Sequence, residues 1–132
     1  MRGEDISGYT AKIDYLFQCG VESIGIGDGG NEIGMGNVLR GIVDEGLPVV
    51  PCVTEVDRLL IATVSNWGAY GLVAGLDRDV GLGIEERVVA LLEEAGRYGI
   101  VDGVTGELGT EDGFGVEVTR EVIGKLVELV NE

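Results

Sequence analysis

The chain has 132 residues, of which 24 are acidic, nine are basic and none is histidine, so its formal net charge is −15. Such a charge repels nucleic acid and excludes it as a partner, while the hydrophobic share of 45% excludes a disordered chain. No apolar run is long enough to span a membrane, and the N-terminal segment MRGEDIS does not resemble a signal peptide.

These bounds predict one cytoplasmic domain over residues 1–132, with no nucleic-acid or membrane partner. Cys19 and Cys52 form no CxxC pattern, which argues against a structural zinc site or a disulfide framework. The large negative charge is typical of a surface that salt screens. Because histidine is missing, acid–base chemistry must fall to Asp, Glu, Tyr, Cys or Lys.

In the first half of the chain, strands and helices are predicted to alternate. The expected elements are a helix over 9–17, a strand over 21–27, a helix over 32–45 and a strand over 48–53. Gly25 and Gly27 lie among the β-branched residues of the first strand and indicate either close packing or the near approach of another backbone.

The second half is predicted to be mostly helical. Residues 59–64, LLIATV, fit either a buried strand or the middle of a helix. The elements that follow are a helix over 69–76 opened by residues 65–68, a helix over 84–95, a strand over 98–105, an acidic loop over 106–115 and a helix over 118–130. Trp67 is expected to pack and not to stack on a ligand. This alternation predicts an α/β fold, a mainly parallel or mixed sheet flanked by helices in a single domain.

The loop of residues 28–32, DGGNE, follows the first predicted strand and precedes a helix. In open α/β sheets, ligands bind beyond the carboxyl ends of strands. Gly29 and Gly30 leave the backbone bare, and a helix start offers unpaired N–H groups to an anion. The alternative is a tight turn in which Asp28 or Asn31 caps the helix.

Four groups of segments, DIS–YTA–IDYLF, IGIGDGGNEIGMGN, SNWGAYGL and VDGVT, together resemble the C-terminal domain of the D-glutamate cyclase family. The resemblance touches nearly the whole chain and implies a lyase that converts D-glutamate to 5-oxo-D-proline and water. The family domain has a comparable stretch before the DIS motif, whereas Met1 here stands only a few residues ahead of it. We therefore expect a homo-oligomer, or a partner protein that carries the other half.

Cyclisation of glutamate needs a base for the amine and a means of neutralising the γ-carboxylate. We expect a divalent cation, Mg²⁺, Mn²⁺ or Ca²⁺, on oxygen ligands, and one carboxylate whose pKa is raised to accept the amine proton. The candidate catalytic residues are Asp28, Glu32, Asp57 and Asp102; the candidate ligand-binding residues are Gly29, Gly30, Asn31, Ser65 and Asn66; the candidate metal ligands are Asp28, Asn31 and Glu32.

Two other functions remain open from the residues alone. Carboxylates expected at strand ends, Asp28, Asp57 and Asp102, are also what a metal-dependent phosphoesterase needs. A non-catalytic subunit that binds a metal or a small ligand is the other. Turnover of D-glutamate, or phosphate release from a phosphoester, separates the three.

Overall fold

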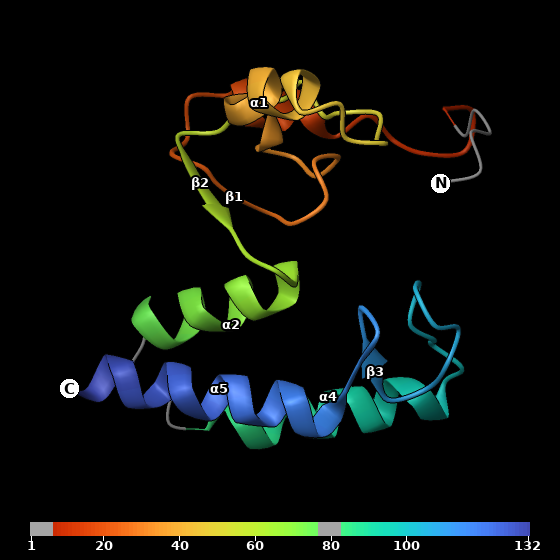
Figure 1. The fold of residues 1–132 in the computed structure, drawn as a ribbon, viewed down its shortest axis with the longest axis vertical. Helices are drawn as coiled ribbons and strands as arrows, with labels where there is room; N and C mark the ends of the chain where they lie inside the picture. The colour runs from red at the N-terminus through yellow and green to blue at the C-terminus, as the bar shows by residue number, and fades with distance from the viewer. Residues whose placement is uncertain (1–6, 77–82) are drawn as a thin grey trace. The chain divides into compact units, whose positions relative to one another are not determined.

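The computed structural model describes residues 7–76 and 83–132 (Figure 1). Short strands alternate with helices along the chain. The strands form two separate sheets of two strands each. This confirms an α/β fold with short mixed sheets flanked by helices. The chain divides into two compact units, Met1–Leu60 and Ile61–Glu132. Within the described residues, no helix has the length and apolar character needed to cross a membrane.

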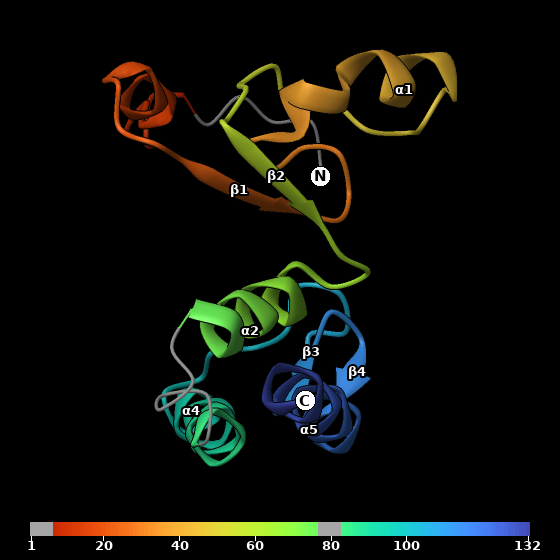
Figure 2. The same ribbon diagram turned by 90° about the vertical axis from the view of Figure 1, so that its left-hand side faces the viewer.

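The first unit is built around a pair of short strands, which run in the same direction (Figure 2). Its elements are a 3₁₀ helix Asp14–Gln18, strand β1 Ile24–Gly27, a 3₁₀ helix Met35–Val38, helix α1 Leu39–Asp44 and strand β2 Arg58–Ile61. β2 shows that the ambiguous run LLIATV begins as a strand. The buried hydrophobic side chains of this unit are Met35 and Ile42.

The glycines of the first unit allow backbones to touch. A Cβ on Gly25 would lie 2.7 Å from the carbonyl oxygen of Ile33, and one on Gly36 would lie 2.6 Å from that of Val53. The N–H groups of Gly34 and Gly36 both donate to the carbonyl of Thr54, at 3.0 and 3.2 Å. The prediction of close backbone approach at Gly25 is therefore confirmed.

Three predicted elements of the first unit are wrong in whole or in part. The helix over 9–17 is reduced to the 3₁₀ helix Asp14–Gln18, and none of its residues is buried. The helix over 32–45 is confirmed only from Met35 to Asp44, as a 3₁₀ helix followed by α1, because Gly34 with its φ of 104° cannot belong to a helix and delays the start. The segment 48–53 forms no strand, since its two prolines lack the N–H groups that a ladder needs. The DIS motif lies partly outside the described residues.

The second unit is a layer of helices with a small hairpin. It contains α2 Ser65–Leu76, α4 Ile84–Arg97, α5 Val116–Asn131, β3 Thr110–Glu111 and β4 Phe114–Gly115. α5 packs against both α2 and α4 (Figures 1 and 2). Ile84, Val88 and Ile123 form its core, and Tyr70, Leu92 and Val127 pack around them. α4 and α5 confirm the two predicted periodic helices, and α2 confirms the helix over 69–76 but begins at Ser65, within the segment predicted as its cap and turn.

The predicted strand over 98–105 is wrong, and the strands lie in the segment predicted as a loop. Asp112 and Gly113 connect β3 to β4 with φ values of 48° and 89°. Two consecutive residues at positive φ are typical of a type I′ turn, for which Asp-Gly is a favoured sequence. The turn places Glu111 opposite Phe114 in the antiparallel pair.

Candidate functional site

In the first unit, the glycine loop is closed by its own glutamate. The N–H of Gly29 donates to the Glu32 carboxylate oxygens at 3.2 Å, and that of Gly30 donates to Oε2 at 2.9 Å. Gly29 and Gly30 were predicted to bind a ligand, and the Glu32 carboxylate accepts hydrogen bonds from their backbone N–H groups instead. Asp28 is exposed directly after β1, and Asn31 is half-buried.

A metal at this loop stays a prediction. Residues 7–76 and 83–132 contain no group of three or more His, Cys, Asp or Glu side chains arranged to hold an ion. Glu32 Oε1 accepts from Gly29 and Oε2 accepts from Gly29 and Gly30, so a cation at this loop would share the carboxylate with these backbone donors.

Asp57 has a structural role at the opposite end of the same sheet. It accepts hydrogen bonds from the N–H and the hydroxyl of Ser23 at 2.8 and 2.9 Å. These bonds lower the pKa of Asp57. Asp57 precedes β2, and Ser23 precedes β1, whereas Asp28 follows β1. The expectation that Asp57 follows a strand is therefore wrong, because the predicted strand over 48–53 does not form.

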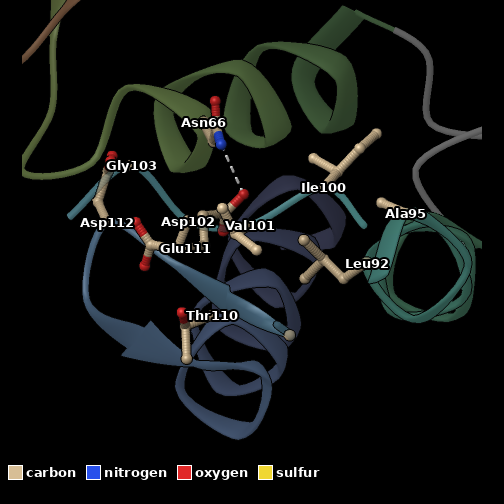
Figure 3. A pocket seen from close by; sticks show the side chains of 11 residues that line it. Asn66, Leu92, Ala95, Ile100, Val101, Asp102, Gly103, Thr110, Glu111 and Asp112 are labelled. Carbon is tan, nitrogen blue, oxygen red and sulfur yellow. Dashed lines mark hydrogen bonds between the residues drawn. The ribbon is translucent and has the colours of Figure 1, made fainter. Parts of the chain in front are cut away.

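In the second unit, Glu111 is a buried carboxylate, 5% exposed, that accepts four side-chain hydrogen bonds. Asn66 Nδ2 and Tyr70 Oη donate to Oε1 at 2.7 and 2.5 Å. Trp67 Nε1 and Thr119 Oγ1 donate to Oε2 at 3.1 and 3.0 Å. Glu111 thereby links the first turns of α2 and α5 to the hairpin. Figure 3 shows the bond from Asn66.

Two neighbouring groups respond to this environment. Burial, together with the bond to Glu111, raises the pKa of Tyr70 well above its usual value, so the phenol stays protonated and acts as a donor. The Trp67 ring packs on Phe114 with centroids 4.9 Å apart, in agreement with its predicted packing role. The hydroxyl of Thr119 is fully buried against Glu111.

Asp102 is the second buried carboxylate of this unit, 9% exposed. It accepts hydrogen bonds from the N–H groups of Val104 at 2.7 Å and Gly113 at 2.8 Å. These backbone donors lower its pKa to about 2. Asp102 is therefore ionised at neutral pH. Its pKa is lowered, whereas the base that accepts the amine proton was expected to have a raised pKa.

Asn66, Asp102 and Glu111 line one cavity of about 240 Å³ (Figure 3). This is smaller than a typical drug-sized pocket and suits a ligand of amino-acid size. None of the residues that line it is lysine or arginine. The lining consists of Asn66, Leu92, Ala95, Ile100, Val101, Asp102, Gly103, Gly109, Thr110, Glu111 and Asp112.

The structure thus groups the predicted residues by unit. Asp28, Gly29, Gly30, Asn31, Glu32 and Asp57 belong to the first unit, and Ser65, Asn66 and Asp102 to the second. Asn66 and Asp102 meet at the cavity, whereas Ser65 begins α2 outside its lining. Sequence reasoning missed Glu111, and the signal that identifies it is the Asp-Gly dipeptide that follows it, a hairpin turn.

Comparison with known proteins agrees with the resemblance of the motifs. The family described as D-glutamate cyclase-like, C-terminal, matches residues 1–127. The chain is also 47% identical over 83 residues to the D-glutamate cyclase, mitochondrial, of Homo sapiens. That match covers 57% of this chain and 13% of the human protein, so the chain spans only a small part of its relative. The chain belongs to the D-glutamate cyclase-like, C-terminal family.

Proposed function

We propose that this chain carries part or all of the active site of a lyase that converts D-glutamate to 5-oxo-D-proline and water. The observation that carries the proposal is the family match over residues 1–127. The family match also favours a lyase over the phosphoesterase suggested by strand-end carboxylates.

The reaction is a ring closure that needs no net proton uptake. The amine nitrogen of D-glutamate forms a bond to its own γ-carboxyl carbon, and one oxygen of that carboxyl leaves. The ammonium group gives up two of its three protons, and the departing oxygen takes two to become water. A protein group that moves protons from the nitrogen to the oxygen is therefore sufficient for acid–base catalysis.

The cavity of the second unit fits the ammonium end of this substrate. Asp102 supplies a negative charge at neutral pH, and Asn66 supplies an amide. Since a carboxylate and an ammonium attract each other strongly when partly shielded from water, we assign this cavity to the amine. Asp102 binds and orients in this scheme, because a carboxyl group with a pKa of about 2 is a weak base.

The two carboxylates of the substrate need positive partners that the cavity lining does not include. We propose that a divalent cation, or cationic side chains of a second chain, supplies them. The second chain is either another copy or a protein that contains the rest of the relative's length, of which this chain spans 13%. Light scattering across dilution tests for a second copy, and a strict monomer at every concentration would count against it.

Turnover decides the main proposal. The purified chain is incubated with D-glutamate, with and without Mg²⁺ or Mn²⁺, and 5-oxo-D-proline is measured by chiral chromatography. We expect product from D-glutamate and none from L-glutamate. The variant Asn66→Ala is expected to raise KM, and Asn131→Ala serves as its matched control because Asn131 is exposed at the end of α5.

A second function, a non-catalytic subunit that binds the ligand, is favoured by the small share of the relative that the chain covers. Calorimetry distinguishes it from the lyase. Binding of D-glutamate or 5-oxo-D-proline without turnover under any of the cation conditions would establish the subunit and overturn the lyase for this chain alone.

A further inference from the structure

The contacts of Glu111 constrain the direction of its neighbours. A carboxylate has only acceptor atoms, and an indole N–H can only donate. Trp67 therefore fixes Oε2 of Glu111 as an acceptor. At Oε1 the partner is the amide of Asn66, which has a donor end and an acceptor end. As long as position 111 is a carboxylate, the nitrogen of that amide must face it.

We propose that Glu111 is a positioning residue for Asn66 and sets which end of the Asn66 amide is offered to a ligand. The nitrogen is held on Glu111 Oε1, and the oxygen is directed away from Glu111 (Figure 3). An amide oxygen accepts hydrogen bonds from an ammonium group, as the amine end of an amino-acid substrate requires. This assignment rests on the proposed function and adds to it a residue that acts through Asn66.

The surroundings of Glu111 hold the carboxylate in place. Tyr70 lies one helical turn after Asn66 on α2 and donates to the same oxygen. Thr119 on α5 donates to the other oxygen. Glu111 itself belongs to β3, whose register is fixed by the pairing of Glu111 with Phe114. A carboxylate held from three elements cannot follow a rotation of the Asn66 amide, so the amide must adapt to it.

The substitution Glu111→Gln tests this directly. Glutamine has one acceptor end and one donor end. The Trp67 N–H is shared between Glu111 Oε2 at 3.1 Å and Thr119 Oγ1 at 3.2 Å, and a second donor facing it from position 111 would be repelled, so the acceptor end of the glutamine turns toward Trp67. The new NH₂ group therefore faces Asn66, whose amide must rotate to present its oxygen. The hydroxyl of Tyr70 can accept as well as donate, so the network stays satisfied and the fold is retained. The amide end offered to a ligand is now reversed.

The matched control is Thr119→Val, which removes one donor to Oε2 and leaves the Asn66 contact with Oε1 in place. It is expected to lower stability without changing the Asn66 amide. With D-glutamate as substrate, we expect Glu111→Gln to raise KM about tenfold with little change in kcat, the pattern of lost uniform binding, and Thr119→Val to leave KM unchanged.

Nuclear magnetic resonance of the ligand-free protein separates this inference from the proposed function. The side-chain NH₂ signals of Asn66 are expected to shift in Glu111→Gln and to stay in place in Thr119→Val. Unchanged Asn66 signals in Glu111→Gln, or equal rises of KM in both variants, would overturn the positioning role. If Asn66 responds as expected but the unsubstituted protein makes no 5-oxo-D-proline, the lyase proposal fails and the positioning role stands.

Discussion

Glu32, Asp57 and Asp102 each accept hydrogen bonds from backbone N–H groups of neighbouring turns or strand ends. In a helix or sheet these N–H groups would donate to backbone carbonyls. In a loop no carbonyl is in reach, and the carboxylate accepts the hydrogen bond instead. Their residue type alone suggested catalysis, but the contacts show that each also fixes the conformation of a glycine-containing loop or of a strand start. Variants at these positions must therefore be read for stability before activity.

For Asp102, the lowered pKa predicts a particular dependence of stability on pH. The folded-state pKa of about 2 lies below the ordinary value of 3.8, so the stabilisation is present above pH 3.8 and is lost as the pH falls toward 2. Asp102→Asn should remove this part of the acid response and lower stability at pH 7. Urea unfolding at pH 7, 4 and 3 measures both. A variant whose stability falls in parallel with that of the unsubstituted protein would contradict the assignment.

For Glu32, the contacts predict a loop defect that is separable from metal binding. Glu32→Gln replaces one of the two oxygens that face Gly29 and Gly30, so we expect a loss of about 1 kcal/mol and faster amide hydrogen exchange at both glycines. Asp28→Asn is the second variant at this loop. Calorimetric titration with Mn²⁺ tests the predicted metal site independently: equal affinity in both variants and the unsubstituted protein would remove Asp28 and Glu32 as ligands.

At the scale of elements, the sequence predicted the helices that have a partner within their own unit. α2, α4 and α5 have 12, 14 and 16 residues and each packs on another helix; α4 and α5 have an apolar stripe, whereas α2 is apolar on most of its surface. The apolar face over 9–17 has the same spacing, but most of its side chains are exposed in the first unit: Tyr9 is 92% exposed, Ile13 53% and Leu16 54%. A periodic sequence shows that a helix would have one apolar face. Whether that face is buried depends on contacts with other elements, which the local sequence does not contain.

The candidate site was predictable only in part for a similar reason. The motif SNWGAYGL identified Asn66, and the segment VDGVT identified Asp102, but nothing local connects either to Glu111, which is 45 residues from Asn66 in the chain. The hairpin that presents Glu111 has two residues in each strand, too short for an alternating pattern. The Asp112-Gly113 dipeptide, which is typical of a hairpin turn, was the one local feature of the sequence that indicated this hairpin.

Close glycine packing yields a prediction for the elements of the first unit. A Cβ on Gly36 would lie within 2.7 Å of backbone atoms of Val53 and Thr54, which cannot move aside as a side chain could. Gly36→Ala should therefore cost roughly 1–3 kcal/mol. Gly41, inside α1, has no atom within 4 Å of its would-be Cβ, so Gly41→Ala should stabilise by about 0.5–1 kcal/mol. Thermal unfolding compares the pair, and a tolerated Gly36→Ala would show that the backbone of Val53 and Thr54 can shift.

At the scale of the whole molecule, the dominant property is the charge of −15. The ion pairs of the described residues are mostly exposed; Arg58–Glu22 and Lys125–Glu121 have side chains about two-thirds exposed on both partners. Such pairs contribute little. They cannot offset the repulsion among 24 acidic residues, which outnumber the nine basic residues by 15.

Salt should therefore stabilise this protein. The Debye length is about 30 Å at 0.01 M ionic strength, about 8 Å at 0.15 M and about 3 Å at 1 M, so each increase removes repulsion between more distant carboxylates. The expected result is a melting temperature that rises steadily with KCl, measured by calorimetry. Sodium chloride at equal ionic strength should act similarly if screening is the cause, whereas sucrose, which stabilises by exclusion from the surface without screening, sets the non-ionic reference. A melting temperature that is flat from 0.01 to 1 M salt would show that the acidic surface carries no self-repulsion large enough to affect folding.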